Sequence, residues 1–314
     1  MHAIKKAIPA ALLLAFAGAA QAQVSVYGLI DMSYGKNEFV KDTKADLHSG
    51  GDDGNSQGNS TTRFGFKGSN DVGNGIKANF KFESGGLTTD GAVNGTLFNR
   101  QAWLGFSGGF GEVRFGRQDD VAFQTMADFD LNGASNGASA IGYAGIGPWL
   151  AGGRQTQSIQ YISPTQNGLK VQVGFSPKGE RVGAEDHFSA GVTFAKGAFA
   201  AAVAFETKRT ETDESFASVT ASYDLKVAKV VVGFTDAGGD KNTGTSIGVV
   251  APIAGYNIGF QHARHNDSSE TKNSVTEVFV NKEVLKNTYA YIEGARMNDR
   301  DGTQSAAVGV IYVF

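Results

Sequence analysis

The pentapeptide "GFSGG" at 105–109 matches the pattern G-x-S-x-G, in which a serine can act as the nucleophile of a hydrolase. That chemistry requires the serine to lie on a sharp turn between a strand and a helix. After Ser107 the chain continues as "FGEVRFGR", which alternates like a further strand. We therefore expect a β-hairpin at this position, and we expect that the protein is not an enzyme.

Histidine and acidic residues could instead bind metal ions. The five histidines show no metal-ligand spacing: His2, which lies in the segment expected to be cleaved, His48, His187, His262 and His265. His262 and His265 are three residues apart at a strand end, where they would not share one face, so they are interpreted as loop residues. Asp299 and Asp301 precede a glycine as in a calcium loop, but the glutamate that would complete the loop is missing downstream. The sequence therefore predicts no metal site and no cofactor.

The charged side chains are expected to be positioned by strands, because apolar residues recur with a period of two. In "GLKVQVGFSP", Leu169, Val171 and Val173 share one face, while Lys170 and Gln172 lie on the other. Strict alternation of this kind is typical of a strand with one apolar face.

Sixteen segments show this pattern. They lie near 24–34, 60–69, 75–85, 96–107, 110–118, 154–163, 168–176, 187–196, 197–207, 215–224, 227–236, 244–252, 255–264, 273–283, 287–297 and 304–314. The connections between them are alternately short and long, as in an up-and-down barrel that stands in an outer membrane. The sequence therefore predicts an all-β fold, a 16-stranded antiparallel transmembrane β-barrel.

A soluble β-sandwich is the alternative, because its strands also alternate. In a sandwich the apolar face forms a dry core and the polar face meets bulk water. Here the polar face carries many charged residues, and sixteen strands with such an interior would enclose water. The aromatic residues near strand ends suit the interfaces of a membrane: Tyr27, Phe175, Tyr223, Tyr256, Tyr289 and Tyr312.

The beginning of the chain has the features of a secretory signal. Lys5 and Lys6 precede an apolar stretch that ends in Ala20-Gln21-Ala22, so we expect residues 1–22 to be cleaved and 23–314 to form the barrel domain. Without these two lysines, 26 of the 28 basic residues remain against 31 acidic ones. The resulting net charge near −5 argues against a nucleic-acid partner.

The last segment ends on an apolar face formed by Val308, Val310, Tyr312 and Phe314. An open sheet edge in hydrocarbon would leave backbone groups without hydrogen bonds. The last strand is therefore expected to pair with the first one, "VSVYGLIDMSYG", and Phe314 is expected to form part of the wall.

The connection at 119–153 is too long to be an idle loop in a compact protein. Val121, Phe123, Met126 and Phe129 could line one side of a short helix, with Asp128 and Asp130 exposed. Together with Trp149, these apolar residues favour a segment packed inside the barrel over a disordered loop.

The order of these segments resembles the Gram-negative general porins, particularly the neisserial and burkholderial type of β-proteobacteria. The resemblance extends over essentially the whole mature chain and depends on "VSVYGLIDMSYG", "TTRFGFKGSNDVGNGIKANFKFE", "NRQAWLGFSGGFGEVRFGRQ", "QSIQYISPTQNGLKVQVGFS" and "AVGVIYVF". It implies a homotrimer and an inward-folded third extracellular loop that narrows the pore. It also implies contact with outer-membrane lipid and lipopolysaccharide, and a Phe314 that the barrel assembly machinery reads.

The expected activity is passive diffusion of ions and small hydrophilic solutes through a water-filled channel. The alternatives are an outer-membrane barrel enzyme and an adhesin without an open lumen. Porins of this type set wall arginines against loop carboxylates, which implies that Arg63, Arg100 and Arg154 face Asp128 and Asp130 across the narrowest section.

Strand alternation supports the inward orientation of these arginines. Arg63 lies opposite to the lipid-facing Phe64 and Phe66, and Arg154 shares a face with polar residues. Arg100 shares its face with Ala102, Leu104 and Phe106, which would then have to pack against the third loop. The same alternation places further basic residues on the pore wall: Lys67, Lys77, Lys81, Arg114 and Lys170. The alternative is that the three arginines lie at the rim or bind anionic lipid headgroups.

Overall fold

The computed structural model describes residues 23–40, 44–50, 58–93, 95–134, 136–146, 153–236, 238, 243–266, 274–298 and 303–314. The expected signal at 1–22, Trp149 and the pair Asp299 and Asp301 lie outside these residues. Within the described ranges, the model contains no helix of the length and apolarity that a membrane span requires.

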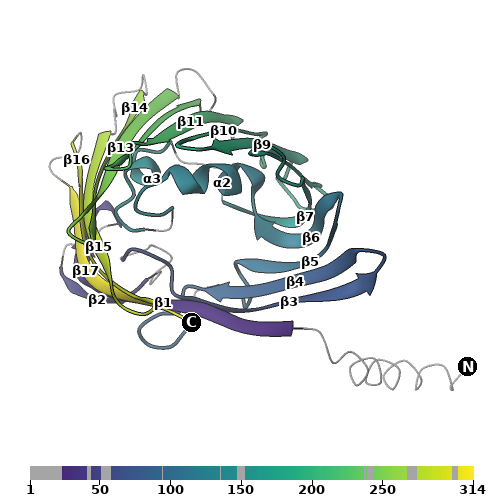
Figure 1. Ribbon diagram of the computed structural model, residues 1–314, viewed down its shortest axis with the longest axis horizontal. Helices are drawn as coiled ribbons and strands as arrows, with labels where there is room; N and C mark the ends of the chain where they lie inside the picture. Colours follow the sequence, from purple (N-terminus) through teal and green to yellow (C-terminus); the bar gives the residue numbers. More distant parts are fainter. Residues whose placement is uncertain are drawn as a thin grey trace, which may run out of the picture.

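The described strands form one antiparallel sheet that closes into a barrel (Figure 1). The strands are β1 Gln23–Asn37, β2 Asp46–Ser49, β3 Arg63–Gly73, β4 Ile76–Gly85, β5 Gln101–Gly108, β6 Gly111–Asp119, β7 Arg154–Ile162, β8 Leu169–Ser176, β9 His187–Lys196, β10 Phe199–Glu206, β11 Phe216–Asp224, β12 Lys229–Asp236, β13 Thr243–Ile253, β14 Tyr256–Asn266, β15 Ser274–Leu285, β16 Thr288–Met297 and β17 Gln304–Val313. The sheet has 17 strands. Because β2 is a short addition beside β1, sixteen of the described strands form the wall, and each matches one expected segment.

The barrel closes between its first and last strands. β1 pairs with β3 along one edge and with β17 along the other, where Leu29 lies opposite Val313. Gly28 and Phe314 exchange two backbone hydrogen bonds of 3.0 Å each. A Cβ atom on Gly28 would lie 2.6 Å from the Phe314 ring, so this close pairing requires glycine. The prediction that the last strand pairs with the first is confirmed.

The strand β2 was not expected from the sequence. It pairs Asp46–Ser49 with residues 32–35 of β1, beyond the point where β3 leaves that edge of β1. Its four residues, "DLHS", are too few to show alternation, and they lie within the expected connection at 35–59.

The outer face of the wall is apolar. Along β17, Val308, Val310 and Tyr312 are 52%, 44% and 48% exposed, as the alternating pattern predicts for residues that contact lipid. Tyr27 differs from the expected interfacial aromatics. Its hydroxyl donates a hydrogen bond to Glu83 at 2.7 Å, and the Lys67 ammonium lies 4.9 Å from the centre of its ring. Tyr27 therefore belongs to the polar inner face, and its expected place at the lipid interface is wrong.

The described part of the connection between β6 and β7 lies inside the ring of strands (Figure 1). We call residues 120–146 the inner loop; it contains α2 Val121–Met126, η3 Ala127–Phe129 and α3 Ala140–Tyr143. The helix α2 contacts β9 and β10, and α3 contacts β14 and β15.

Two apolar clusters join the inner loop to the wall. One consists of Ala122, Met126 and Phe129 of the loop with Ala202, Ala204, Phe216 and Val231 of β10–β12. The other consists of Ala138, Ala140, Ile141, Ala144 and Ile146 of the loop with Ala263, Val275, Ala295 and Met297 of β14–β16. Burial of apolar area contributes about 25 cal/mol per Å², so these clusters favour docking of the loop on the wall.

Small wall residues let the loop approach the sheet closely. A Cβ atom on Gly191 of β9 would lie 1.9 Å from the Thr125 hydroxyl oxygen. On Gly244 of β13 it would lie 2.2 Å from a methyl carbon of Ile146. Larger side chains at either position would exclude the loop, so the glycines determine where it docks.

Candidate functional site

The arginines predicted from the sequence gather at one edge of the wall. Arg63 begins β3, Arg100 immediately precedes β5, and Arg154 begins β7. All three follow long connections, and in an up-and-down barrel the long connections share one edge. Arg117, near the end of β6, joins them there. We call these four residues the arginine cluster.

Two carboxylates lie within the arginine cluster. The Arg100 Nε donates to a Glu83 carboxylate oxygen at 2.6 Å, and the Lys81 ammonium lies 3.3 Å from the other Glu83 oxygen. The Arg154 Nε lies 2.9 Å from an Asp119 carboxylate oxygen, which makes an ion pair without hydrogen-bond alignment.

The other two arginines bond mainly to the backbone of the rim. An Arg63 guanidinium nitrogen donates to the Thr61 carbonyl at 3.3 Å, and Arg117 donates to the Asn99 carbonyl. Charge–charge interactions link Arg100 to both Arg63 and Arg154. The three predicted arginines are therefore brought together.

Alternation gave only part of this arrangement. Leu104 and Phe106 are exposed on the outer face, so the expectation that they pack against the loop with Arg100 is wrong. Arg100 points to Glu83 because it precedes β5, after a backbone reversal at Phe98 with φ +57°.

Arg117 was missed for a related reason. A register shift lies between Gly116 and Gln118 opposite β7, and Gly116 has φ +130°. This irregularity interrupts the alternation of β6 ahead of Arg117. A β-bulge cannot be recognised from the polar and apolar pattern alone.

The predicted wall lysines line a cavity on the inner side of β1 and β3–β6. It has a volume of about 840 Å³, and its lining includes Lys67, Lys77 and Lys81 together with Asp71 and Glu112. Arg114 lies beside it, with its guanidinium 4.4 Å from the Trp103 ring centre and 2.7 Å from a Glu112 oxygen. Lys170 lies in β8, opposite Thr193 of β9. This part of the wall presents mainly basic groups to the lumen.

The two predicted loop acids have different environments. Asp128 is exposed, as expected. Asp130 is only 6% exposed and accepts a hydrogen bond from the Ser139 hydroxyl at 2.7 Å, so its expected exposure opposite the arginines is wrong. Burial raises the pKa of Asp130 to about 6. The cause is the end of α2 at Met126, after which η3 changes the phase of the residues that follow.

Buried acids of the wall bind the inner loop from the other side. Glu277 accepts hydrogen bonds from the Asn132 amide at 2.7 Å and from the Ala140 backbone N–H at 2.9 Å. Glu293 accepts from the same Asn132 amide at 2.8 Å and from Asn59 at 3.0 Å. These hydrogen bonds join both the backbone and a side chain of the inner loop to the wall.

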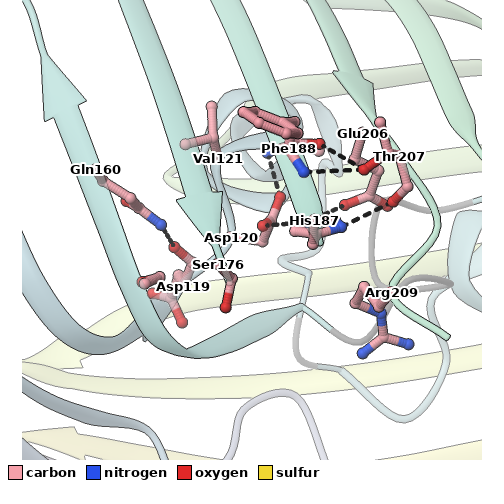
Figure 2. Close-up of polar contacts among 12 residues, drawn as sticks. Asp119, Asp120, Val121, Gln160, Ser176, His187, Phe188, Glu206, Thr207 and Arg209 are labelled. Carbon is pink, nitrogen blue, oxygen red and sulfur yellow. Dashed lines mark hydrogen bonds and ion pairs between the residues drawn. The ribbon is translucent and has the colours of Figure 1, made fainter. Parts of the chain in front are cut away.

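A third polar group joins the beginning of the inner loop to β9 and β10 (Figure 2). His187 lies 3.0 Å from Asp120 and 4.0 Å from Glu206, and all three side chains are buried. His187 lies in the expected strand segment at 187–196 and is the first residue of β9. The expectation that His262 and His265 are loop residues is wrong, because both lie in β14. Burial alone would raise the pKa of Asp120, but the contacts with His187 and the Ala122 N–H lower it below its usual range.

Ser107 lies on the hairpin that joins β5 to β6, as predicted. Its hydroxyl accepts a hydrogen bond from the Asn79 amide at 2.9 Å. The segment is a strand-to-strand connection, which lacks the strand-to-helix turn of a hydrolase nucleophile.

A closed barrel with an apolar outer face, charged inner wall and docked inner loop defines a membrane channel. The model of the Gram-negative porin family matches residues 10–302, and the chain belongs to that family. It is an outer-membrane porin of the β-proteobacterial type, a channel for passive diffusion of ions and small hydrophilic solutes, and its family indicates a channel that is not an enzyme.

Similar proteins include outer membrane porin protein 32 of Delftia acidovorans, which is 29% identical over 292 residues, covering 85% of this chain and 81% of that protein. The major outer membrane protein P.IB of Neisseria gonorrhoeae is 27% identical over 240 residues, covering 74% and 68%. Among solved structures, an anion-selective porin from Comamonas acidovorans has a TM-score of 0.77 at 22% identity, covering 94% of this chain and 100% of that one. The trimer form of OmpT from Vibrio cholerae has a TM-score of 0.69 at 14% identity, covering 93% and 99%.

Proposed function

We propose that this porin favours anions, and that the arginine cluster is its selectivity filter. The observation that carries the proposal is the excess of positive charge at the edge of the wall where the long connections lie. There the arginine cluster surrounds two carboxylates, Glu83 and Asp119. In these six residues, four positive charges exceed two negative ones. An anion that passes this edge is attracted, and a cation is repelled.

The size of the effect follows from Coulomb's law. One unpaired unit charge at about 8 Å from a passing ion contributes about 0.5 kcal/mol in water and about 2 kcal/mol at an effective dielectric constant near 20. A narrow lumen with low-dielectric walls lies between these limits and focuses the field. Two excess charges therefore suffice for a several-fold preference between anions and cations.

The exposed Asp128 is the remaining candidate for an acid on the inner loop. Its carboxylate would oppose the arginines and create a field across the lumen. Arg63, Arg100 and Arg154 would then act as the basic side of the constriction, with Lys67, Lys77, Lys81, Arg114 and Lys170 extending the basic wall toward the short connections.

The test is the reversal potential of a planar bilayer in a salt gradient. We expect the wild type to favour anions, and a variant with Arg63→Gln, Arg100→Gln and Arg154→Gln to shift toward cations while retaining the barrel. Asp128→Asn should shift the potential slightly toward anions. Arg296→Gln is the matched control, because Arg296 is exposed on β16 away from the cluster.

Coincident reversal potentials for the wild type and the triple variant would disprove the filter and would favour rim or lipid-binding arginines. An adhesin without an open lumen would give no conductance steps at all. Circular dichroism of the wild type and of the triple variant should show the same β-sheet signal. This measurement distinguishes a loss of selectivity from a loss of fold.

We also propose that the protein assembles as a homotrimer in contact with lipopolysaccharide, and that the barrel assembly machinery recognises Phe314. Support comes from the exposed aromatic ring of Phe314 beside β1 and from the trimer form of the similar OmpT of Vibrio cholerae. An unboiled SDS gel should show a band near three times the mature mass, and a monomer band alone would contradict the trimer.

A further inference from the structure

Three polar residues from separate elements meet at the beginning of the inner loop (Figure 2). Asp120 is the N-cap of α2, His187 is the first residue of β9, and Glu206 is the last residue of β10. Their side chains are 1%, 2% and 0% exposed. One possible ligand atom from each residue lies within 4.8 Å of those of the other two. We call these three residues the loop-root cluster.

The hydrogen bonds of His187 determine which ring nitrogen faces the acids. Its Nδ1 lies 2.8 Å from the Thr207 backbone carbonyl oxygen. A carbonyl oxygen can only accept, so Nδ1 carries a proton and donates it. The Nε2 atom therefore faces Asp120 at 3.0 Å and Glu206 at 4.0 Å. The Nε2 atom is hydrogen-bonded to Asp120 in the absence of a metal ion, so coordination would replace the proton of that hydrogen bond. With Nδ1–H fixed on a carbonyl, the ring would then have the arrangement that is usual for metal-binding histidines.

Glu206 supplies a second, independent observation. Neither of its carboxylate oxygens accepts a hydrogen bond from an N–H or O–H donor in the described part of the chain, although the residue is fully buried, and its carboxyl group lies within hydrogen-bonding reach of Asp120. The nearby cation, Arg209, lies 3.4 Å from Asp213, and that pair forms its own ion contact. A buried carboxylate without a hydrogen bond is costly and requires a positive charge or a proton beside it.

We propose that the loop-root cluster is a binding site for one divalent transition-metal ion of the zinc class. A neutral imidazole and two carboxylates balance the charge of a dication. Zinc bonds to nitrogen and oxygen of about 2.0–2.2 Å place tetrahedral ligands roughly 3.4 Å apart. The distances of 3.0 and 4.0 Å between donor atoms lie on either side of that value.

The ion would join the inner loop to the wall. The second oxygen of Asp120, Oδ1, accepts the Ala122 backbone N–H at 2.9 Å and so caps α2. One carboxylate thus begins the helix with one oxygen and faces the metal position with the other. Binding of the ion would hold the first turn of α2 against β9 and β10, where the apolar contacts of Ala122 also begin.

The experiment uses the full mature chain, purified without a polyhistidine tag in detergent, and titrated with Zn²⁺ and with Co²⁺ as a spectroscopic probe. We expect one Zn²⁺ per chain and visible Co²⁺ absorption bands of an ion bound to nitrogen and oxygen. Ca²⁺ should not compete, because it takes six or more oxygen ligands. Affinity should fall at pH 5.5, since bound ligands must be deprotonated.

Glu206→Gln and His187→Gln should each weaken Zn²⁺ binding by about tenfold or more. Substitution of residues that only hydrogen-bond to a metal ligand already lowers affinity by about that factor, and these two residues would be ligands themselves. Asp120→Asn is a further variant, because asparagine keeps the N-cap while it removes the charge. His262→Gln is the matched control. The His262 Nδ1 lies 2.9 Å from the Thr276 hydroxyl, outside the cluster, and the variant should bind Zn²⁺ like the wild type.

Absence of stoichiometric binding to the folded wild type would overturn the proposal and leave protons as the only neutralising charge. Equal Zn²⁺ affinity in the wild type and the three cluster variants would also overturn it. If a variant does not fold, the wild-type stoichiometry and the Co²⁺ spectrum still decide, because both are measured on the unaltered chain.

Discussion

The two halves of the inner wall use the same alternating strands in different ways. From β9 to β16 the buried positions are mostly small, apolar, uncharged polar or acidic, and the inner loop docks on this side. In β1 and β3–β7 the inward positions carry the arginine cluster and the basic cavity lining. The covered half holds the loop, and the open half presents charge to the lumen.

This division shows that binary patterning fixes only which face of a strand points inward. Gly191 and Gly244 make room for Thr125 and Ile146, while the equivalent face on the open side carries the partly exposed Arg63 and Lys81. The position of the loop, and therefore of the pore, depends on the sizes of the inward residues. The alternating pattern of polar and apolar residues does not distinguish these sizes.

The two halves meet where β1 pairs with β17. Among the substitutions and deletions considered, we expect a change at this pairing to reduce assembly of the barrel most. Deleting Phe314 removes two backbone hydrogen bonds to Gly28, and each unsatisfied group in hydrocarbon costs several kcal/mol. The yield in the outer membrane should fall several-fold while secretion is unchanged, as measured by pulse labelling and fractionation.

Phe314→Ala separates the backbone from the ring at this seam. If it assembles normally, the hydrogen bonds carry the effect; if it fails like the deletion, recognition of the aromatic ring does. An unchanged yield for the deletion would contradict both explanations.

A larger side chain at Gly191 should disturb the surface on which the inner loop docks. Gly191→Leu places side-chain atoms where Thr125 lies, and overpacking of this kind costs about 1–3 kcal/mol. The undocked population of the inner loop should rise about 5- to 150-fold, measured as the rate of proteolytic cleavage within 120–146. Gly294→Leu is the control on the outer face, where a Cβ atom meets only a backbone oxygen at 3.4 Å. Equal cleavage rates in both variants would show that Gly191 does not set the docking position.

The third prediction compares one buried glutamate from each half. Glu83→Gln removes the negative charge beside Arg100, so the preference for anions should rise by roughly twofold, an effect of about 0.5 kcal/mol. Glu277→Gln should leave the reversal potential unchanged, because Glu277 faces Asn132 and Ala140 of the docked loop. Equal shifts in the two variants would mean that the halves do not differ electrically.

The sequence predicted every wall strand, because long runs in contact with lipid must alternate regardless of what lies inside. It failed where local geometry breaks the alternation. Phe98, at φ +57°, redirects Arg100, and the irregularity at Gly116 hid Arg117. The loop-root cluster was missed for another reason. Its members lie far apart in the chain, and each resembles an ordinary residue at a strand end.

The covered half could have been recognised from one further signal. Gly174, Gly191, Ala202 and Ala204, followed by Gly244 and Gly248, put small residues at inward positions where a porin lumen would otherwise show polar side chains. Such a stripe predicts a docked segment on those strands. The residues of the inner loop that dock on this stripe cannot be predicted from sequence spacing. The chain changes from the period of the α-helix α2 to that of the 3₁₀ helix η3 within a few residues.

The smallest expected effect is a pH dependence of loop docking that arises from Asp130. Burial raises the pKa of this carboxyl to about 6 in the folded protein, above its value of 3.8 in an exposed chain. The stabilisation from its protonated form is fully present below about pH 4 and is lost as the pH rises through 6. Hydrogen exchange of 120–146, corrected for intrinsic rates, should therefore be slower at pH 5 than at pH 7.5. Asp130→Asn keeps an acceptor for Ser139 but cannot ionise, so it should reduce this difference. It should not abolish the difference, because Glu277 interacts with the same site. If the variant and the wild type change equally with pH, Asp130 does not contribute to the titration of the docked loop.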